Sequence, residues 1–170
     1  SKPRYTVVMA PTLETIIPQA FAGCNGLNSI QLPSNLTSIE WEAFINCKRL
    51  TSLTFPEGLT TIEERAFSGC THLTSVDFQN TSNIVIENEA FAGCKRLESV
   101  YFHPNQTSIT FGQNVFQECN QNLILYVGAK TQLLGNLPDD VTVRVRGSGG
   151  AAAAGDVVFS DPGSEVKEQA

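Results

Sequence analysis

Basic residues are scarce in this 170-residue chain, in which 11 lysines and arginines stand against 17 aspartates and glutamates. The formal net charge at pH 7 is therefore -6. Proteins that bind nucleic acid or anionic membranes need a basic surface that attracts phosphate groups. The composition excludes nucleic acid as a partner and favours partners that are neutral or basic.

Long apolar runs are missing as well. No stretch approaches the roughly 18 consecutive apolar residues of a membrane-spanning helix, and the start of the chain, Ser1-Lys2-Pro3-Arg4, lacks the apolar core of a signal peptide. We therefore expect membrane contact only through parts of a longer protein that lie outside this sequence.

The chain also lacks the short motifs that mark common catalytic and ion-binding sites. It contains no G-x-S-x-G, no H-E-x-x-H, no phosphate-binding glycine loop and no EF-hand spacing. No C-x-x-C occurs either, although the chain has five cysteines. We expect no cofactor, no metal site and no enzymatic activity.

What the sequence does contain is a repeat. The pattern Ala-Phe-x-x-Cys-x-x-Leu-x-x-apolar-x-apolar occurs four times and then once in a degenerate form. A period of about 20 to 29 residues with one short strand per coil is typical of leucine-rich repeats, whose coils bury their apolar sides by stacking on one another. The phenylalanines of the pattern, 23 to 25 residues apart, are Phe21, Phe44, Phe67, Phe91 and Phe116.

The two halves of each repeat predict different local structures. Segments such as Ile30-Gln31-Leu32 alternate apolar and polar residues, which predicts a parallel sheet of stacked short strands. The Ala-Phe-x-x-Cys segments are short and lack β-branched runs, so we expect tight helical or 3₁₀ turns on the opposite side. The expected fold class is an α/β-type repeat solenoid of about five coils with a C-terminal cap.

The phrase AFxxCxxLxxIxLPxxLTxI, which Ala43 to Ile62 follow, closely resembles the BspA-like, or Treponema-type, leucine-rich repeat family. The resemblance covers roughly residues 8 to 128. Members of that family are mostly surface-exposed or secreted proteins of bacteria and some protozoan parasites, and several are adhesins. The resemblance implies a cell-surface or extracellular location and a protein ligand, such as a host extracellular or cell-surface protein.

The ends of the chain depart from the repeat. Residues 1–146 are expected to form the leucine-rich repeat domain, which begins inside a longer array and ends in a cap at 123–146 with a short helix near Thr131 to Leu134. Residues 147–170 begin with a glycine- and alanine-rich stretch that resembles a cloning linker as much as a natural one. We expect this tail to be flexible and dispensable for folding.

The cysteines share one position in successive coils. Equivalent residues of stacked coils lie about 4.8 Å apart with parallel side chains, which suits neither a disulfide nor a tetrahedral metal site. Cys70 and His72 could suggest a thiol nucleophile with a base, but the repeat places Cys70 toward the core and His72 toward solvent. We expect buried free thiols at Cys24, Cys47, Cys70, Cys94 and Cys119.

Three N-x-[S/T] sequences follow the predicted strands, at Asn35, Asn80 and Asn105. They can carry glycans only if the protein passes through a eukaryotic secretory pathway.

The leading functional hypothesis is an adhesin fragment that binds a protein through the solenoid face. The outward residue of each strand changes along the array from Gln31 and Thr54 to Asp77, Tyr101 and Tyr126, so aromatic side chains gather toward the C-terminal coils. Tyrosines are enriched at interface hot spots. The alternative is that each tyrosine only covers its neighbour's strand.

Three further residues complete the candidate site. His103 follows the strand that contains Tyr101, and Glu98 precedes it, so the two could frame a mixed patch. Trp41 competes as an anchor because its equivalents in other coils are mostly polar. The competing function is a structural spacer that presents another domain, in which case the outward positions should be uniformly polar.

Overall fold

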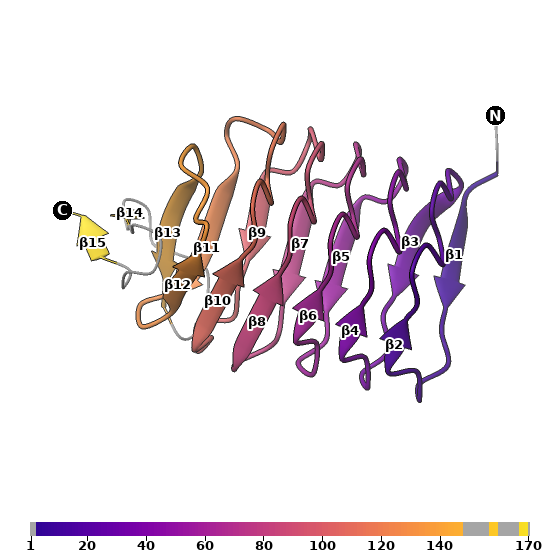
Figure 1. Ribbon diagram of the computed structural model, residues 1–170, viewed down its shortest axis with the longest axis horizontal. Coiled ribbons are helices and arrows are strands. Elements are labelled where there is room, and N and C mark those ends of the chain that lie inside the picture. Colours follow the sequence, from indigo (N-terminus) through magenta and orange to yellow (C-terminus); the bar gives the residue numbers. More distant parts are fainter. Residues whose placement is uncertain (1–2, 148–156, 160–166, 170) are drawn as a thin grey trace.

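The computed structural model describes residues 3–147, 157–159 and 167–169. The described chain winds into a flattened parallel β-solenoid, in which each coil adds one strand to each of two facing sheets (Figure 1). Turns with the Ala-Phe-x-x-Cys sequence join the sheets along one edge, and short loops join them along the other. No helix among the described residues is long and apolar enough to cross a membrane.

The front sheet of Figure 1 is built from the second strand of each coil, and its neighbours run parallel. Its strands are, in spatial order, β12 (Gln132–Gly135), β10 (Ser108–Phe111), β8 (Asn83–Ile86), β6 (Thr61–Ile62), β4 (Ser38–Ile39) and β2 (Thr15–Ile16).

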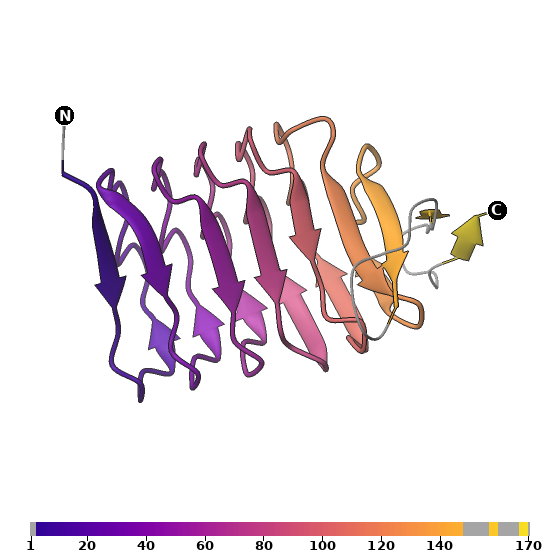
Figure 2. The same cartoon turned by 180° about the vertical axis from the view of Figure 1, so that it is seen from behind.

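The back sheet, which faces the viewer in Figure 2, contains the strands that the alternating pattern predicts. Its parallel strands are β13 (Thr142–Arg146), β11 (Ile124–Gly128), β9 (Ser99–Tyr101), β7 (Ser75–Phe78) and β5 (Ser52–Phe55). Beside β5 lies the parallel pair β3 (Leu27–Gln31) and β1 (Tyr5–Val8). At the other end β14 (Val157–Phe159) pairs antiparallel with β13, and β15 (Lys167–Gln169) with β14.

The expected helical or 3₁₀ turns are absent from the described residues, and that prediction was wrong. In a turn, every second N–H donates to the next coil instead of to its own: Phe44 N donates to Ala66 O at 2.7 Å, whereas Cys47 N donates to Phe44 O at 3.2 Å. A helix needs every N–H for bonds within its own segment. The bonds between coils therefore replace the helix, and the side opposite the predicted sheet is a second sheet.

Left-handed backbone conformations make this alternation possible. Each turn contains two residues with positive φ, such as Glu42 at 54° and Asn46 at 59° in the second turn. Glycine adopts this region without cost, and three of the five second positions are Gly23, Gly69 and Gly93. Residues such as Glu42 adopt it at some cost in free energy, which the hydrogen bonds between neighbouring coils offset.

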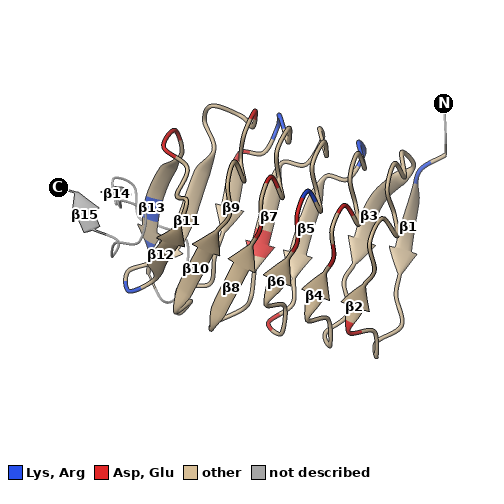
Figure 3. Cartoon of the chain, viewed as in Figure 1, with Lys and Arg blue, Asp and Glu red and all other residues tan. Residues whose placement is uncertain are grey.

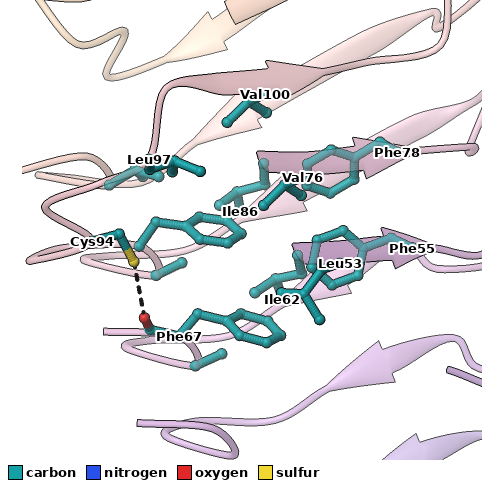
Figure 4. Close-up of a cluster of buried hydrophobic side chains, with 14 of the residues drawn as sticks. Leu53, Phe55, Ile62, Phe67, Val76, Phe78, Ile86, Cys94, Leu97 and Val100 are labelled. Carbon is teal, nitrogen blue, oxygen red and sulfur yellow. Dashed lines mark hydrogen bonds between the residues drawn. The ribbon is translucent and has the colours of Figure 1, made fainter. Parts of the chain in front are cut away.

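The phenylalanines predicted from the repeat form a continuous stack inside the solenoid. Phe67 lies between Phe44 and Phe91, with ring centroids 5.0 and 5.4 Å away and nearly parallel planes. A second stack joins Phe55, Phe78 and Phe102 at 4.7 Å, and the edge of Phe55 meets Phe67 at 5.5 Å. Figure 4 shows the two stacks meeting inside the solenoid beside the aliphatic residues of both sheets.

The C-terminal cap differs from its prediction. The segment near Thr131 to Leu134 is not a helix but part of β12, which extends the front sheet, and β11 and β13 extend the back sheet. Residues 136–141 join β12 to β13 directly and replace a sixth turn. Of the predicted tail at 147–170, residues 148–156, 160–166 and 170 lie outside the described residues, and the strands β14 and β15 belong to the remainder.

Replacing Phe67 with Ala should lower the free energy of unfolding by roughly 3 to 5 kcal/mol, because the ring is fully buried and stacked on both sides. Phe116→Ala should cost less, since this ring has one stacking neighbour, Phe91 at 5.9 Å, and is 6% exposed. Urea unfolding of both variants measures the difference. Equal losses would mean that the fifth turn is as well supported as the central ones.

Candidate binding surface

The outer face of the back sheet brings three of the predicted site residues, Asp77, Tyr101 and Tyr126, into one row. Because the parallel strands pair without a register shift, Thr54 lies opposite Asp77, Asp77 opposite Tyr101, Tyr101 opposite Tyr126 and Tyr126 opposite Arg144. Side chains at paired positions of neighbouring strands lie within contact distance on the same face.

Tyr101 and Tyr126 form a stacked pair at the centre of this row. Their ring centroids are 4.7 Å apart with planes inclined by 12°, and both residues are half-buried. The guanidinium carbon of Arg146 lies 5.5 Å from the centre of the Tyr101 ring, and its Nη1 donates a hydrogen bond to Phe102 O at 3.0 Å. Stacking and the cation–π contact fix both rings before any partner arrives.

Arg146 is the residue that sequence reasoning missed. It pairs in register with Gly128 on β11, and its guanidinium reaches across to the Tyr101 ring on β9. The sequence did contain a signal for a strand here, because valines alternate with Thr142, Arg144 and Arg146. We predicted a cap for this segment and therefore did not predict the arginine contact, which forms only because β13 continues the back sheet.

Asp77 and His103 border the tyrosine pair. Partial burial raises the pKa of the Asp77 carboxyl, and the charges of Arg146 and His103 act in the opposite direction. The His103 ring is held by its own loop, since its Nδ1 accepts the N–H of Asn105 at 3.0 Å. We define the tyrosine patch as Asp77, Tyr101, His103, Tyr126 and Arg146.

The other two candidates lie elsewhere. Glu98 is exposed just before β9, at the opposite end of that strand from His103, and none of the contacts among the described residues joins it to the tyrosine patch. Trp41 is 45% exposed on the turn edge, where its backbone N–H donates to the Glu63 carboxylate at 3.2 Å. The structure therefore separates Trp41 from the tyrosines.

A shallow groove continues the same face toward the N-terminal coils. It has a volume of about 680 Å³, and its lining is mixed, with polar residues such as Gln31 and Thr54 beside apolar ones such as Val8 and Met9. Thr54 is the strand neighbour of Asp77, so the groove adjoins the tyrosine patch. In Figure 3 most charges gather along the turn edge, and the strands hold few.

The five thiols are free, and four of them have a role that the sequence did not reveal. Each donates a hydrogen bond to the phenylalanine carbonyl of the preceding coil. The bonds join Cys47 to Phe21 at 3.1 Å, Cys70 to Phe44 at 3.3 Å, Cys94 to Phe67 at 3.3 Å and Cys119 to Phe91 at 3.0 Å. The cysteines therefore connect coils.

The expectation of buried thiols holds for Cys47, Cys70 and Cys94, but Cys24 and Cys119 in the terminal turns are only partly buried. These two have a neighbouring turn on one side only. Cys70 lies inside the core, whereas His72 is exposed beside the Thr71 hydroxyl. The structure does not bring this thiol and this imidazole together. No group of three metal-ligating side chains occurs in the part of the chain that the structure describes.

The three possible glycosylation sites differ in access. Asn35 and Asn105 are exposed, whereas Asn80 is 1% exposed. The Asn80 amide nitrogen donates to the backbone carbonyls of Glu57 at 2.9 Å and Leu59 at 3.0 Å, and its oxygen accepts from Gln106 at 2.8 Å. Asn80 is therefore an interior structural residue.

Stacked coils with one short strand per sheet and inward leucines and phenylalanines define a repeat protein of the leucine-rich type. Residues 4–123 match six copies of the BspA type leucine rich repeat region, and the chain belongs to that family. The family assignment confirms the expected resemblance.

Solved structures of similar fold come from bacterial proteins. The pneumococcal vaccine antigen PcpA has a TM-score of 0.61 and 24% identity, with 89% of this chain and 33% of that chain covered. The Treponema pallidum leucine rich repeat protein TpLRR has a TM-score of 0.49 and 22% identity over 78% of this chain and 76% of that one. A leucine rich cell surface protein of Faecalibacterium prausnitzii has the same TM-score of 0.49 and 22% identity, over 74% and 42%.

The chain thus spans about a third of the length of PcpA. No curated protein matches its sequence.

Thiol-reactive dye should modify Cys47, Cys70 and Cys94 slowly in the folded chain, because these residues are fully buried. Cys24 and Cys119 should react sooner. Peptide mapping after timed labelling measures each site, and labelling in urea gives the control in which all five react. Fast reaction of Cys70 without urea would contradict its buried position in the core.

The stability of the fold should fall in alkaline solution. Burial raises the pKa of Cys47 to about 12, whereas an unperturbed thiol has a pKa of about 8.5. Because only the unfolded chain releases this proton readily, the contribution of Cys47 to stability is complete below about pH 8.5 and is lost as the pH rises toward the folded-state pKa.

Urea unfolding at several pH values tests this expectation. Cys47→Ala should make the alkaline fall shallower by up to about 1.4 kcal/mol per pH unit. Leu50→Val, a buried change in the same coil without a titrating group, is the control and should keep the slope of the parent chain. An unchanged slope in Cys47→Ala would show that this thiol does not titrate differently on unfolding.

Proposed function

We propose that this chain is a non-catalytic binding module of a cell-surface or secreted protein, and that the tyrosine patch is where it contacts a protein partner. The observation that carries the proposal is the Tyr101–Tyr126 stack with Arg146 over it, in a row whose equivalent positions in earlier coils are Gln31 and Thr54. Such a change of character along a repeating surface has no use in packing the core.

The patch has the chemistry of an interface hot spot. Tyrosine and arginine dominate binding energies because they offer large contact areas with polar tips. Here the rings are already stacked and the arginine is already held by the Phe102 carbonyl, so little side-chain entropy remains to be lost on binding. The Asp77 carboxylate beside them adds a charged contact that selects between partners.

The family supports the proposed setting. Similar folds occur in a vaccine antigen and in a cell surface protein, and the chain covers only part of either. An adhesin fragment that binds a host extracellular protein or another cell fits these relatives. A solenoid also provides an extended rigid surface on which such contacts can be arranged.

A structural spacer is the second candidate. The polar side chains of Gln31, Ser52 and Thr54 on the strands of the earlier coils support it, because polar side chains are what a strand face without partners would show. The mutual packing of Tyr101 and Tyr126 would then serve only to cover their strands.

Capture experiments with the isolated chain on extracellular proteins and glycans provide a ligand, and substitutions then locate the site. Tyr101→Ala combined with Tyr126→Ala should weaken binding by at least about 2 kcal/mol, measured by calorimetry, without a comparable loss of stability. Val8→Ala is the control, because Val8 pairs with Gln31 on β1 at the far end of the same face and is 76% exposed.

Trp41→Ala should have less effect than the double change. Unchanged affinity in the double variant would rule out the tyrosine patch as the binding site. No saturable capture of any protein or sugar would favour the spacer.

A further inference from the structure

The fifth turn, residues 113–119, has an edge that no later turn covers within the part of the chain that the structure describes. In the fourth turn, three alternate N–H groups donate to carbonyls of the fifth. These bonds run from Glu89 to Gln113 at 2.9 Å, from Phe91 to Val115 at 3.0 Å and from Gly93 to Gln117 at 2.7 Å.

The corresponding N–H groups of the fifth turn belong to Asn114, Phe116 and Glu118. None of the three has a hydrogen-bond acceptor among the described residues. They lie at alternate positions of a backbone that has the same left-handed residues, Asn114 and Glu118, as the turns before it. The fifth turn therefore presents a row of three backbone N–H donors in the same arrangement as in the earlier turns.

A cavity of about 600 Å³ adjoins this row of donors. It lies between the fifth turn and residues 136–141, the direct connection that replaces a sixth turn. Apolar side chains line its inner part, including Phe116, Leu123, Leu137 and Val141. Phe116 is the last ring of the phenylalanine stack, so the cavity begins where a sixth ring would lie.

The rim of the cavity is acidic. Glu118, Asp139 and Asp140 are exposed there, and no lysine or arginine is among the residues that line it. Charge complementarity at a rim selects partners of opposite sign. Basic side chains are therefore the favoured neighbours of any segment that enters.

We propose that this edge is a second docking site, separate from the tyrosine patch, for a segment of a partner protein that adopts the conformation of the preceding turns and has a large apolar side chain and basic flanks. The segment's carbonyls accept the three free N–H groups, its apolar side chain lies over Phe116, and its basic side chains contact the acidic rim. As in strand addition to a sheet edge, main-chain bonds would give the affinity, and the pocket and the rim would give the selectivity.

The chain itself contains segments of this chemistry. The turn at Ala90-Phe91 continues through Cys94 to Lys95 and Arg96, and it packs on the preceding turn through the same set of bonds. Its carbonyls at Asn88, Ala90 and Ala92 accept the N–H groups of the third turn. A peptide of residues 88–98 with Cys94 replaced by Ala is therefore a suitable probe.

The experiment adds this peptide to the full chain and follows binding by fluorescence anisotropy, together with amide hydrogen exchange by NMR. In the free chain the amides of Asn114, Phe116 and Glu118 should exchange faster than those of Glu89, Phe91 and Gly93. Saturating peptide should slow exchange at the first three. Replacing the peptide's phenylalanine with Ala should weaken binding about thirtyfold.

Two charge variants test the rim. Asp139→Lys with Asp140→Lys should weaken peptide binding about tenfold at low salt. Glu14→Lys with Glu57→Lys changes the net charge equally at exposed loop positions away from the cavity and should leave binding unchanged.

Absence of saturable binding, or binding that leaves the three amides fast, would overturn the proposal. A dimer of the chain that dissociates in the Asp139→Lys, Asp140→Lys variant would overturn it in another way, by showing that a second copy occupies the edge. Neither outcome bears on the tyrosine patch, whose test uses different residues.

Discussion

The structure depends on one constraint, the division of backbone N–H groups between a turn's own coil and the next coil. Where every second donor leaves its coil, the chain can neither close into a helix nor remain an independent loop. Each turn is complete only when its neighbour is present. The same constraint holds the phenylalanine rings at stacking distance and places the thiols of the second to fifth turns at a carbonyl of the coil before.

The outer surface follows from this constraint. With neighbouring coils held in register, a position within the repeat becomes a row on the surface, and a change of residue type along the sequence becomes a change of chemistry along the row. Tyr101 and Tyr126 meet for that reason alone. Arg146 joins them because β13 continues the sheet, although its sequence no longer follows the repeat.

The sequence was sufficient for the features that depend on side-chain period, which include the phenylalanine stack, the cysteine column and the tyrosine row. It was insufficient for the turns. The positive φ of Glu42 and Arg65 is imposed by hydrogen bonds to the next coil, and the residue type at these positions does not predict it. The helix expected near Thr131 failed for a similar reason, since pairing of β12 with β10 decides its conformation. The arginine contact needed long-range register that a short irregular segment does not reveal.

The interior position of Asn80 has a consequence for production of the protein in eukaryotic cells. Its sequence is an acceptor for N-linked sugar, but its side-chain nitrogen is hydrogen-bonded to two carbonyls inside the solenoid. A sugar on that nitrogen would displace a bonded hydrogen and require space that the interior does not have. Secretion from yeast or mammalian cells would therefore divide the product into two populations, a folded one with bare Asn80 and a glycosylated one whose third and fourth coils cannot close.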